Sequence, residues 1–121
     1  MKIKFIDYIK RLFADSSGYA FKYKNIHIVA SLSDVPNDTE DDIYIVQSGK
    51  TRKWVVFRCP NNCGHRVEVN LMKVRYPFWR LTLDRKKVSL YPSVVVNDCD
   101  AHFWLRNNGV LWATFDHEDF Y

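Results

Sequence analysis

The stretch Cys59-Pro60-Asn61-Asn62-Cys63-Gly64 decides the predicted fold, together with the later Cys99-Asp100-Ala101-His102. These two segments contain all three cysteines of the chain. Three residues separate Cys59 from Cys63, and two separate Cys99 from His102, so each gap lets a short loop turn two side chains toward one ion. Three thiolates and one imidazole meet the tetrahedral preference of zinc. We therefore predict a structural zinc bound by Cys59, Cys63, Cys99 and His102.

The fourth ligand has a competitor in His65, which lies two residues past Cys63 at the start of an expected strand. His102 is favoured because it has the spacing of a metal pair with Cys99. If both histidines reached the ion, water could displace one of them, and the site would suit a zinc-dependent hydrolase. The remaining alternative is that the cysteines are buried free thiols.

Length and composition predict one globular domain over residues 1–121, with 47% hydrophobic and 16% aromatic residues. The 18 basic and 14 acidic residues give a formal charge of +4, which permits nucleic-acid contact without arguing for it. No run approaches the roughly 20 apolar residues that span a bilayer. The N-terminal charges interrupt any signal-peptide pattern. An odd cysteine count without an export signal favours reduced thiols and a cytoplasmic location.

The pattern of apolar residues changes period along the chain. Residues 3–14 place apolar side chains on one helical face and predict an amphipathic α-helix, and residues 21–29 read as strand. Short strands joined by turn residues then predict hairpins over 43–58, 78–90 and 102–114, with a half-buried strand at 66–71. The predicted fold class is mainly β: zinc-stabilised antiparallel hairpins, like a split zinc ribbon, with an N-terminal α-helix.

No recognised catalytic motif is present. The chain lacks G-x-S-x-G, H-E-x-x-H and the P-loop pattern, and Pro60 follows Cys59 where a zinc deaminase has proline before cysteine. We therefore predict no catalytic residue and a protein that works by contact. The predicted partner-binding residues are Arg52, Lys73 and Arg75. Basic residues interleaved with aromatic ones also fit a nucleic-acid-binding module, which is the alternative.

A series of motifs runs through the second half of the chain: Cys63-Gly64, Trp79-Arg80-Leu81, Ser89-Leu90-Tyr91-Pro92-Ser93-Val94, and Cys99 through Trp112-Ala113. This series resembles a family of small bacterial zinc-binding proteins of unknown function. The resemblance covers residues 35–114, the expected zinc-binding β domain, and leaves the helix and strand of residues 1–30 outside it. It departs from the family at the first knuckle, where relatives have a tighter Cys-Pro-Cys-Gly-Cys.

The resemblance implies a pathway rather than a reaction. Genes of that family lie beside bacterial ubiquitin-like modifiers, their activating and conjugating enzymes and deconjugating metalloproteases, in operons associated with antiphage defence. The implied function is a zinc-bound, non-catalytic adaptor that contacts the modifier or its activating or conjugating enzymes. The alternatives are a nucleic-acid-binding zinc-ribbon module and, third, a zinc-dependent hydrolase.

Overall fold

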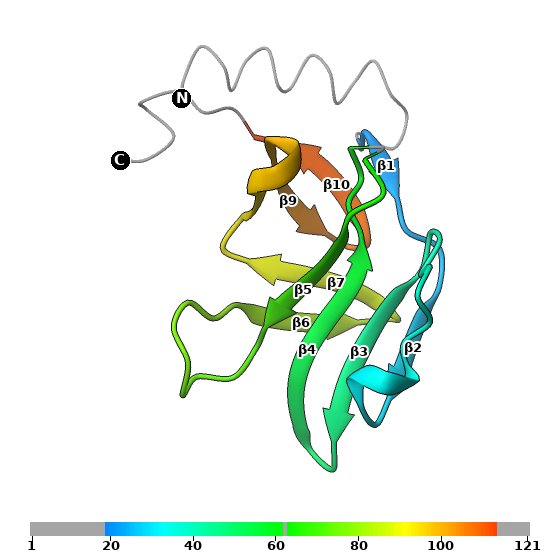
Figure 1. The fold of residues 1–121 in the computed structure, drawn as a ribbon, viewed down its shortest axis with the longest axis vertical. Helices are drawn as coiled ribbons and strands as arrows, with labels where there is room; N and C mark the ends of the chain where they lie inside the picture. The colour runs from blue at the N-terminus through cyan, green and yellow to red at the C-terminus, as the bar shows by residue number, and fades with distance from the viewer. Residues whose placement is uncertain (1–18, 62, 114–121) are drawn as a thin grey trace.

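The computed structural model describes residues 19–61 and 63–113, and these residues form three β-sheets (Figure 1). A four-stranded sheet has the order β1-β10-β9-β8, a second has the order β2-β3-β4-β5, and β6 pairs with β7. The strands are β1 (Phe21–Lys22), β2 (Ile26–Val29), β3 (Ile43–Ser48), β4 (Thr51–Arg58), β5 (Arg66–Asn70), β6 (Arg80–Asp84), β7 (Lys87–Tyr91), β8 (Val94–Val96), β9 (Ala101–Arg106) and β10 (Gly109–Trp112). Two short 3₁₀ turns accompany them, η1 (Leu32–Asp34) and η2 (Asn97–Cys99).

The three predicted hairpins are confirmed as β3–β4, β6–β7 and β9–β10, all antiparallel. Two-residue loops close the last two: Arg85 and Lys86, and Asn107 and Asn108, all have positive φ. Positive φ at both loop positions matches the twist of the flanking strands and fixes their register. The Asn107-Asn108-Gly109 signal therefore correctly placed the hairpin that carries His102.

The pairing of β2 with β3 is parallel, which the sequence did not reveal. Residues 30–42 make the connection and contain η1. Asp42 anchors it at the start of β3, because its carboxylate accepts hydrogen bonds from the backbone and side chain of Asn25 and lies 2.8 Å from Nε2 of His27. The segment at 30–42 thus connects two neighbouring strands of one sheet.

One hydrophobic core joins the three sheets. Phe57 of β4 and Phe103 of β9 are fully buried and meet edge to face, with ring centroids 6.2 Å apart. Val88 and Leu90 of β7 are buried in the same cluster. The side chain and the backbone of Asn108 both bond to Val88, which fixes the β9–β10 turn to β7. This core fixes the positions of the loops that carry the candidate site.

The predicted fold class needs correction. The described residues are mainly β, as expected, but they contain no α-helix, and one strand pair is parallel rather than part of a hairpin. The α-helix predicted for residues 3–14 lies outside the described residues. Within the described part of the chain, no helix is long and apolar enough to cross a membrane.

Candidate functional site

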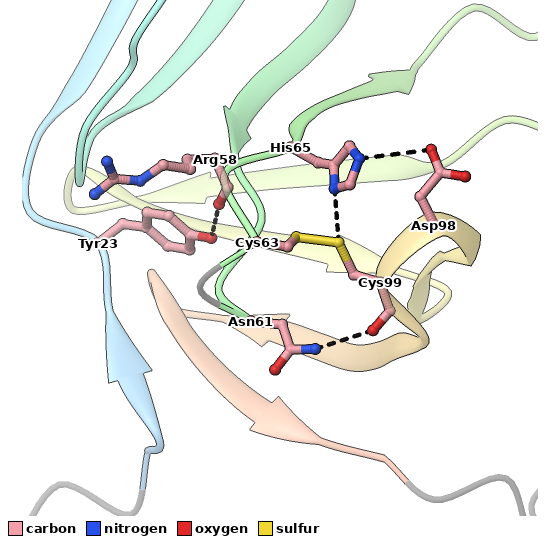
Figure 2. The surroundings of a disulfide bond; sticks show 7 residues. All are labelled: Tyr23, Arg58, Asn61, Cys63, His65, Asp98 and Cys99. Atoms are coloured by element: carbon pink, nitrogen blue, oxygen red, sulfur yellow. Dashed lines mark hydrogen bonds and ion pairs between the residues drawn. A yellow bond between two sulfur atoms is a disulfide. The ribbon is translucent and has the colours of Figure 1, made fainter.

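The three cysteines converge between the β4–β5 loop and η2. Figure 2 shows two of them, Cys63 and Cys99. Their sulfur atoms all lie within 4.8 Å of one another. Cys63 and Cys99 form a disulfide with Cα atoms 6.4 Å apart, and Cys59 is a buried free thiol. The expectation that all three thiols are reduced is therefore wrong for this structure. The expectation that the two separate segments meet is confirmed.

The local backbone explains why the cysteines meet. The β4–β5 ladder continues past Arg58 and Arg66, because the N–H of Cys59 donates to the carbonyl of His65 at 2.8 Å. Gly64 has positive φ and turns the chain back from Cys63. Between this loop and η2, the side-chain amide of Asn61 donates to the backbone carbonyl of Cys99 at 3.0 Å. The loop is thus tied to η2 by a hydrogen bond from the Asn61 side chain as well as by the disulfide.

His65 faces this cluster (Figure 2). Its Nδ1 lies 2.8 Å from Sγ of Cys99, and its Nε2 lies 3.8 Å from a carboxylate oxygen of Asp98. A histidine that ligates a metal commonly gives its second ring nitrogen to a carboxylate, which fixes the ring. His65 therefore has the surroundings of a ligand on both nitrogens.

Tyr23 closes the buried side of the cluster, near Cys59. Its hydroxyl donates to the carbonyl of Arg58 at 2.6 Å. Burial raises the pKa of Tyr23 far above its ordinary value, and the neighbouring Cys59 thiolate would raise it further. Tyr23 is therefore a neutral hydrogen-bond donor here and holds the end of β4, directly before Cys59.

His102 does not belong to the group formed by the three cysteines. It is buried, at 7% exposure, and its Nε2 lies 2.8 Å from Oγ of Ser93. With the ring proton on Nδ1, Nε2 accepts a hydrogen bond from the Ser93 hydroxyl. A separation of about 2.6–3.2 Å is the one required between a serine nucleophile and its general base.

Strand register brings this pair together. Val95 of β8 lies opposite His102 of β9, and alternation places Ser93, two residues before Val95, on the same face. Ser93 is thus a diagonal neighbour of His102 across the two strands, close enough for the side chains to meet. The other side of Ser93 is also held, since Nε1 of Trp79 donates to its carbonyl at 3.1 Å.

Two of the predicted partner-binding residues share a groove. Arg52 and Lys73 line it together with Arg80, while Arg75 is exposed but is not part of the lining. The groove has a volume of about 520 Å³, and its lining includes Tyr91 and Pro92, the two residues before Ser93. The groove that contains Arg52 and Lys73 therefore borders the chain segment directly before Ser93.

Sequence reasoning missed Ser93. Its signal was present, because the motifs that carry the family resemblance include a serine in Ser89-Leu90-Tyr91-Pro92-Ser93 and a histidine in Cys99-Asp100-Ala101-His102. The short spacing between Cys99 and His102 instead suggested a pair of metal ligands. Only the β8–β9 register shows that His102 faces Ser93.

A family model matches residues 31–113: BubE, described as bacterial ubiquitination-like system serine protease. No curated protein and no solved structure matches the chain.

Proposed function

The chain belongs to the BubE family, bacterial ubiquitination-like system serine proteases, and from that premise we propose that it is a serine peptidase whose nucleophile is Ser93 and whose general base is His102. The observation that carries the proposal is the 2.8 Å separation between Ser93 Oγ and His102 Nε2. Membership places the chain in a bacterial ubiquitination-like system, as the resemblance implied. The proposed substrates are polypeptides of that system.

The proposed reaction follows from the pair. Ser93 Oγ attacks the scissile carbonyl carbon while His102 Nε2 takes the hydroxyl proton. The C–N bond then breaks, and His102 returns the proton to the departing amine. Water, deprotonated by His102, hydrolyses the acyl ester and restores the Ser93 hydroxyl. Trp79 contributes by holding the Ser93 backbone in place for these steps.

The experiment is cleavage of a bacterial ubiquitin-like modifier that carries a C-terminal extension, followed by intact mass spectrometry. Wild-type protein should release the extension, and Ser93→Ala should leave the fusion uncut. Ser89→Ala is the matched control, because Ser89 belongs to the same motif but its Oγ accepts from the backbone of Asn107. Cleavage that persists in Ser93→Ala would overturn the proposal.

The non-catalytic adaptor predicted from the sequence is the competing proposal. It is supported by the exposed cations Arg52 and Lys73 that gather in one groove. An adaptor would bind the modifier or its enzymes and leave every fusion uncut, so the same experiment separates the two functions.

We also propose that the reduced protein binds zinc through Cys59, Cys63 and Cys99, with His65 rather than His102 as the fourth ligand. Zn–S bonds of about 2.3 Å suit three sulfurs that already lie within 4.8 Å of one another. Bound zinc would be structural and would tie η2, directly before β9, to the β4–β5 loop. His102 then remains available to Ser93.

Elemental analysis of protein purified under a thiol reductant tests this ligand set. Wild-type protein should contain one zinc per chain, and His65→Ala should bind it more weakly against a competing chelator. His102→Ala should retain the metal. Loss of zinc in His102→Ala but not in His65→Ala would restore the ligand set predicted from the sequence.

A further inference from the structure

The groove beside Ser93 is built from four separate parts of the chain. The first residues of β4, the segment between β5 and β6, β6 itself and the end of β7 all contribute to it. The β5–β6 segment projects at the left of Figure 1. Two lining residues connect the groove to Ser93: Pro92 directly precedes Ser93 in the chain, and Nε1 of Trp79 donates to the carbonyl of Ser93. The lining residues are Arg52, Leu71, Lys73, Phe78, Trp79, Arg80, Leu81, Tyr91 and Pro92.

The charge of this groove has one sign. Three cationic side chains line it, Arg52, Lys73 and Arg80, and no carboxylate does. Within the described residues none of the three forms an ion pair: Arg52 contacts the amide oxygen of Gln47, and Arg80 lies over the ring of Tyr91.

Two arginines elsewhere in the described residues are paired with carboxylates. Arg58 pairs with Asp38 and Asp41, and Arg66 pairs with Glu68. Within the described residues the three groove cations have no such carboxylate partner, so an anionic ligand would supply the opposite charge.

The same groove exposes apolar rings. Phe78 is 37% exposed and Tyr91 is 56% exposed, although both are large and aromatic. Val74 and Tyr76, in the bordering segment, are more exposed still, at 96% and 88%. Exposed apolar side chains grouped beside unpaired cations favour a ligand that carries both carboxylates and apolar groups.

We propose that this groove binds an extended acidic peptide segment of the substrate, in which Asp or Glu alternates with apolar residues, next to the bond that Ser93 attacks. The inference rests on the proposed function, because Ser93 chemistry is what makes a polypeptide the expected occupant. Three cations are also few for a nucleic-acid channel, and the chain as a whole carries only +4.

The test is fluorescence anisotropy on Ser93→Ala protein, which cannot turn over the ligand. The probes are a short dye-labelled peptide of alternating Glu and Leu, the same peptide with Lys in place of Glu, and a single-stranded oligonucleotide. The Glu peptide should bind, the Lys peptide should not, and the Glu peptide's affinity should fall as salt rises.

Charge reversal locates the site. Arg52→Glu combined with Lys73→Glu should lower affinity for the Glu peptide by about tenfold, since each reversal replaces a charge attraction at the surface with a repulsion. Lys87→Glu is the matched control. Lys87 is exposed, begins β7 at the far end of that strand from Tyr91, and is not part of the lining. Circular dichroism confirms that each variant is folded.

Three outcomes would overturn the inference: equal binding of the Lys peptide, binding of the oligonucleotide alone, or an equal loss of affinity in Lys87→Glu. The proposed function is judged separately by the reaction of wild-type Ser93 with a small serine-directed reagent that does not need the groove. Labelled Ser93 without Glu-peptide binding would reject the groove and keep the peptidase.

Discussion

At the residue scale, the functional assignment depends on the direction in which one histidine points. The sequence placed His102 in a metal site because it follows Cys99 at ligand spacing. In the fold, η2 ends at Cys99, Asp100 has positive φ, and β9 begins at Ala101, so Cys99 and His102 lie on different elements. Spacing along the chain could not show this, because a turn of the backbone between two residues redirects the second side chain.

His102→Ala tests this assignment through kinetics. If His102 is the general base, kcat for modifier-fusion cleavage should fall by about two to four orders of magnitude, while KM changes little. Steady-state cleavage rates supply both constants. His27→Ala, which removes a half-buried histidine from β2, is the control for the loss of an imidazole. Equal activity of His102→Ala and wild-type protein would contradict the assigned role.

At the element scale, turns were more predictable than pairings. The residues Asp84-Arg85-Lys86 and Asn107-Asn108-Gly109 encode their hairpins locally, and both hairpins form as predicted. The parallel pairing of β2 with β3 depends on contacts between residues on either side of the 30–42 connection, such as those of Asp42 with Asn25 and His27. No local sequence pattern predicts such contacts. The three-residue strand β8 was also missed, although Val94-Val95-Val96 is β-branched throughout. Without β8, the approach of Ser93 to His102 could not be derived.

The contacts of Asp42 predict a pH-dependent stability at this scale. The hydrogen bond from His27 is the main factor that lowers the pKa of Asp42, burial opposes it, and the bonds from Asn25 add to the lowering. A carboxyl group with a lowered pKa stabilises the fold above its ordinary pKa of about 4. That contribution is lost as pH falls through the lower pKa of the folded state.

Asp42→Ala should therefore reduce the free energy of unfolding at neutral pH by about 1 kcal/mol. Urea titrations of variant and wild-type protein over a range of pH measure the difference. The two proteins should converge in acid, below the pKa of Asp42 in the folded state. A difference that stays constant into acid would show that the carboxylate charge does not support the β2–β3 pairing.

At the scale of the whole molecule, one core holds the three sheets in the arrangement that the site requires. Phe103 of one four-stranded sheet packs its ring against that of Phe57 of the other. Strand β9, which carries Phe103, also carries His102. The cysteine cluster, the Ser93–His102 pair and the groove all lie on loops and strand ends fixed by this core. The hydrophobic composition predicted such a core, but the relative positions of the three sites depend on the packing of the sheets.

Phe103→Ala should reduce the free energy of unfolding by about 3–5 kcal/mol, because it leaves a cavity between the sheets. Chemical denaturation followed by tryptophan fluorescence and by circular dichroism gives the value. The two probes should report one coincident transition, since the sheets share a core. Separate transitions would show that the sheets unfold independently.

The central claim is that Ser93 is an activated nucleophile, and the most direct measurement is its labelling by a fluorophosphonate. The serine oxygen bonds to phosphorus, fluoride leaves, and His102 takes the hydroxyl proton. Tandem mass spectrometry of digested wild-type protein should place one phosphonyl group on Ser93, with labelling abolished in Ser93→Ala and strongly slowed in His102→Ala. An unlabelled wild-type protein, or a label on Ser89 instead, would contradict the account.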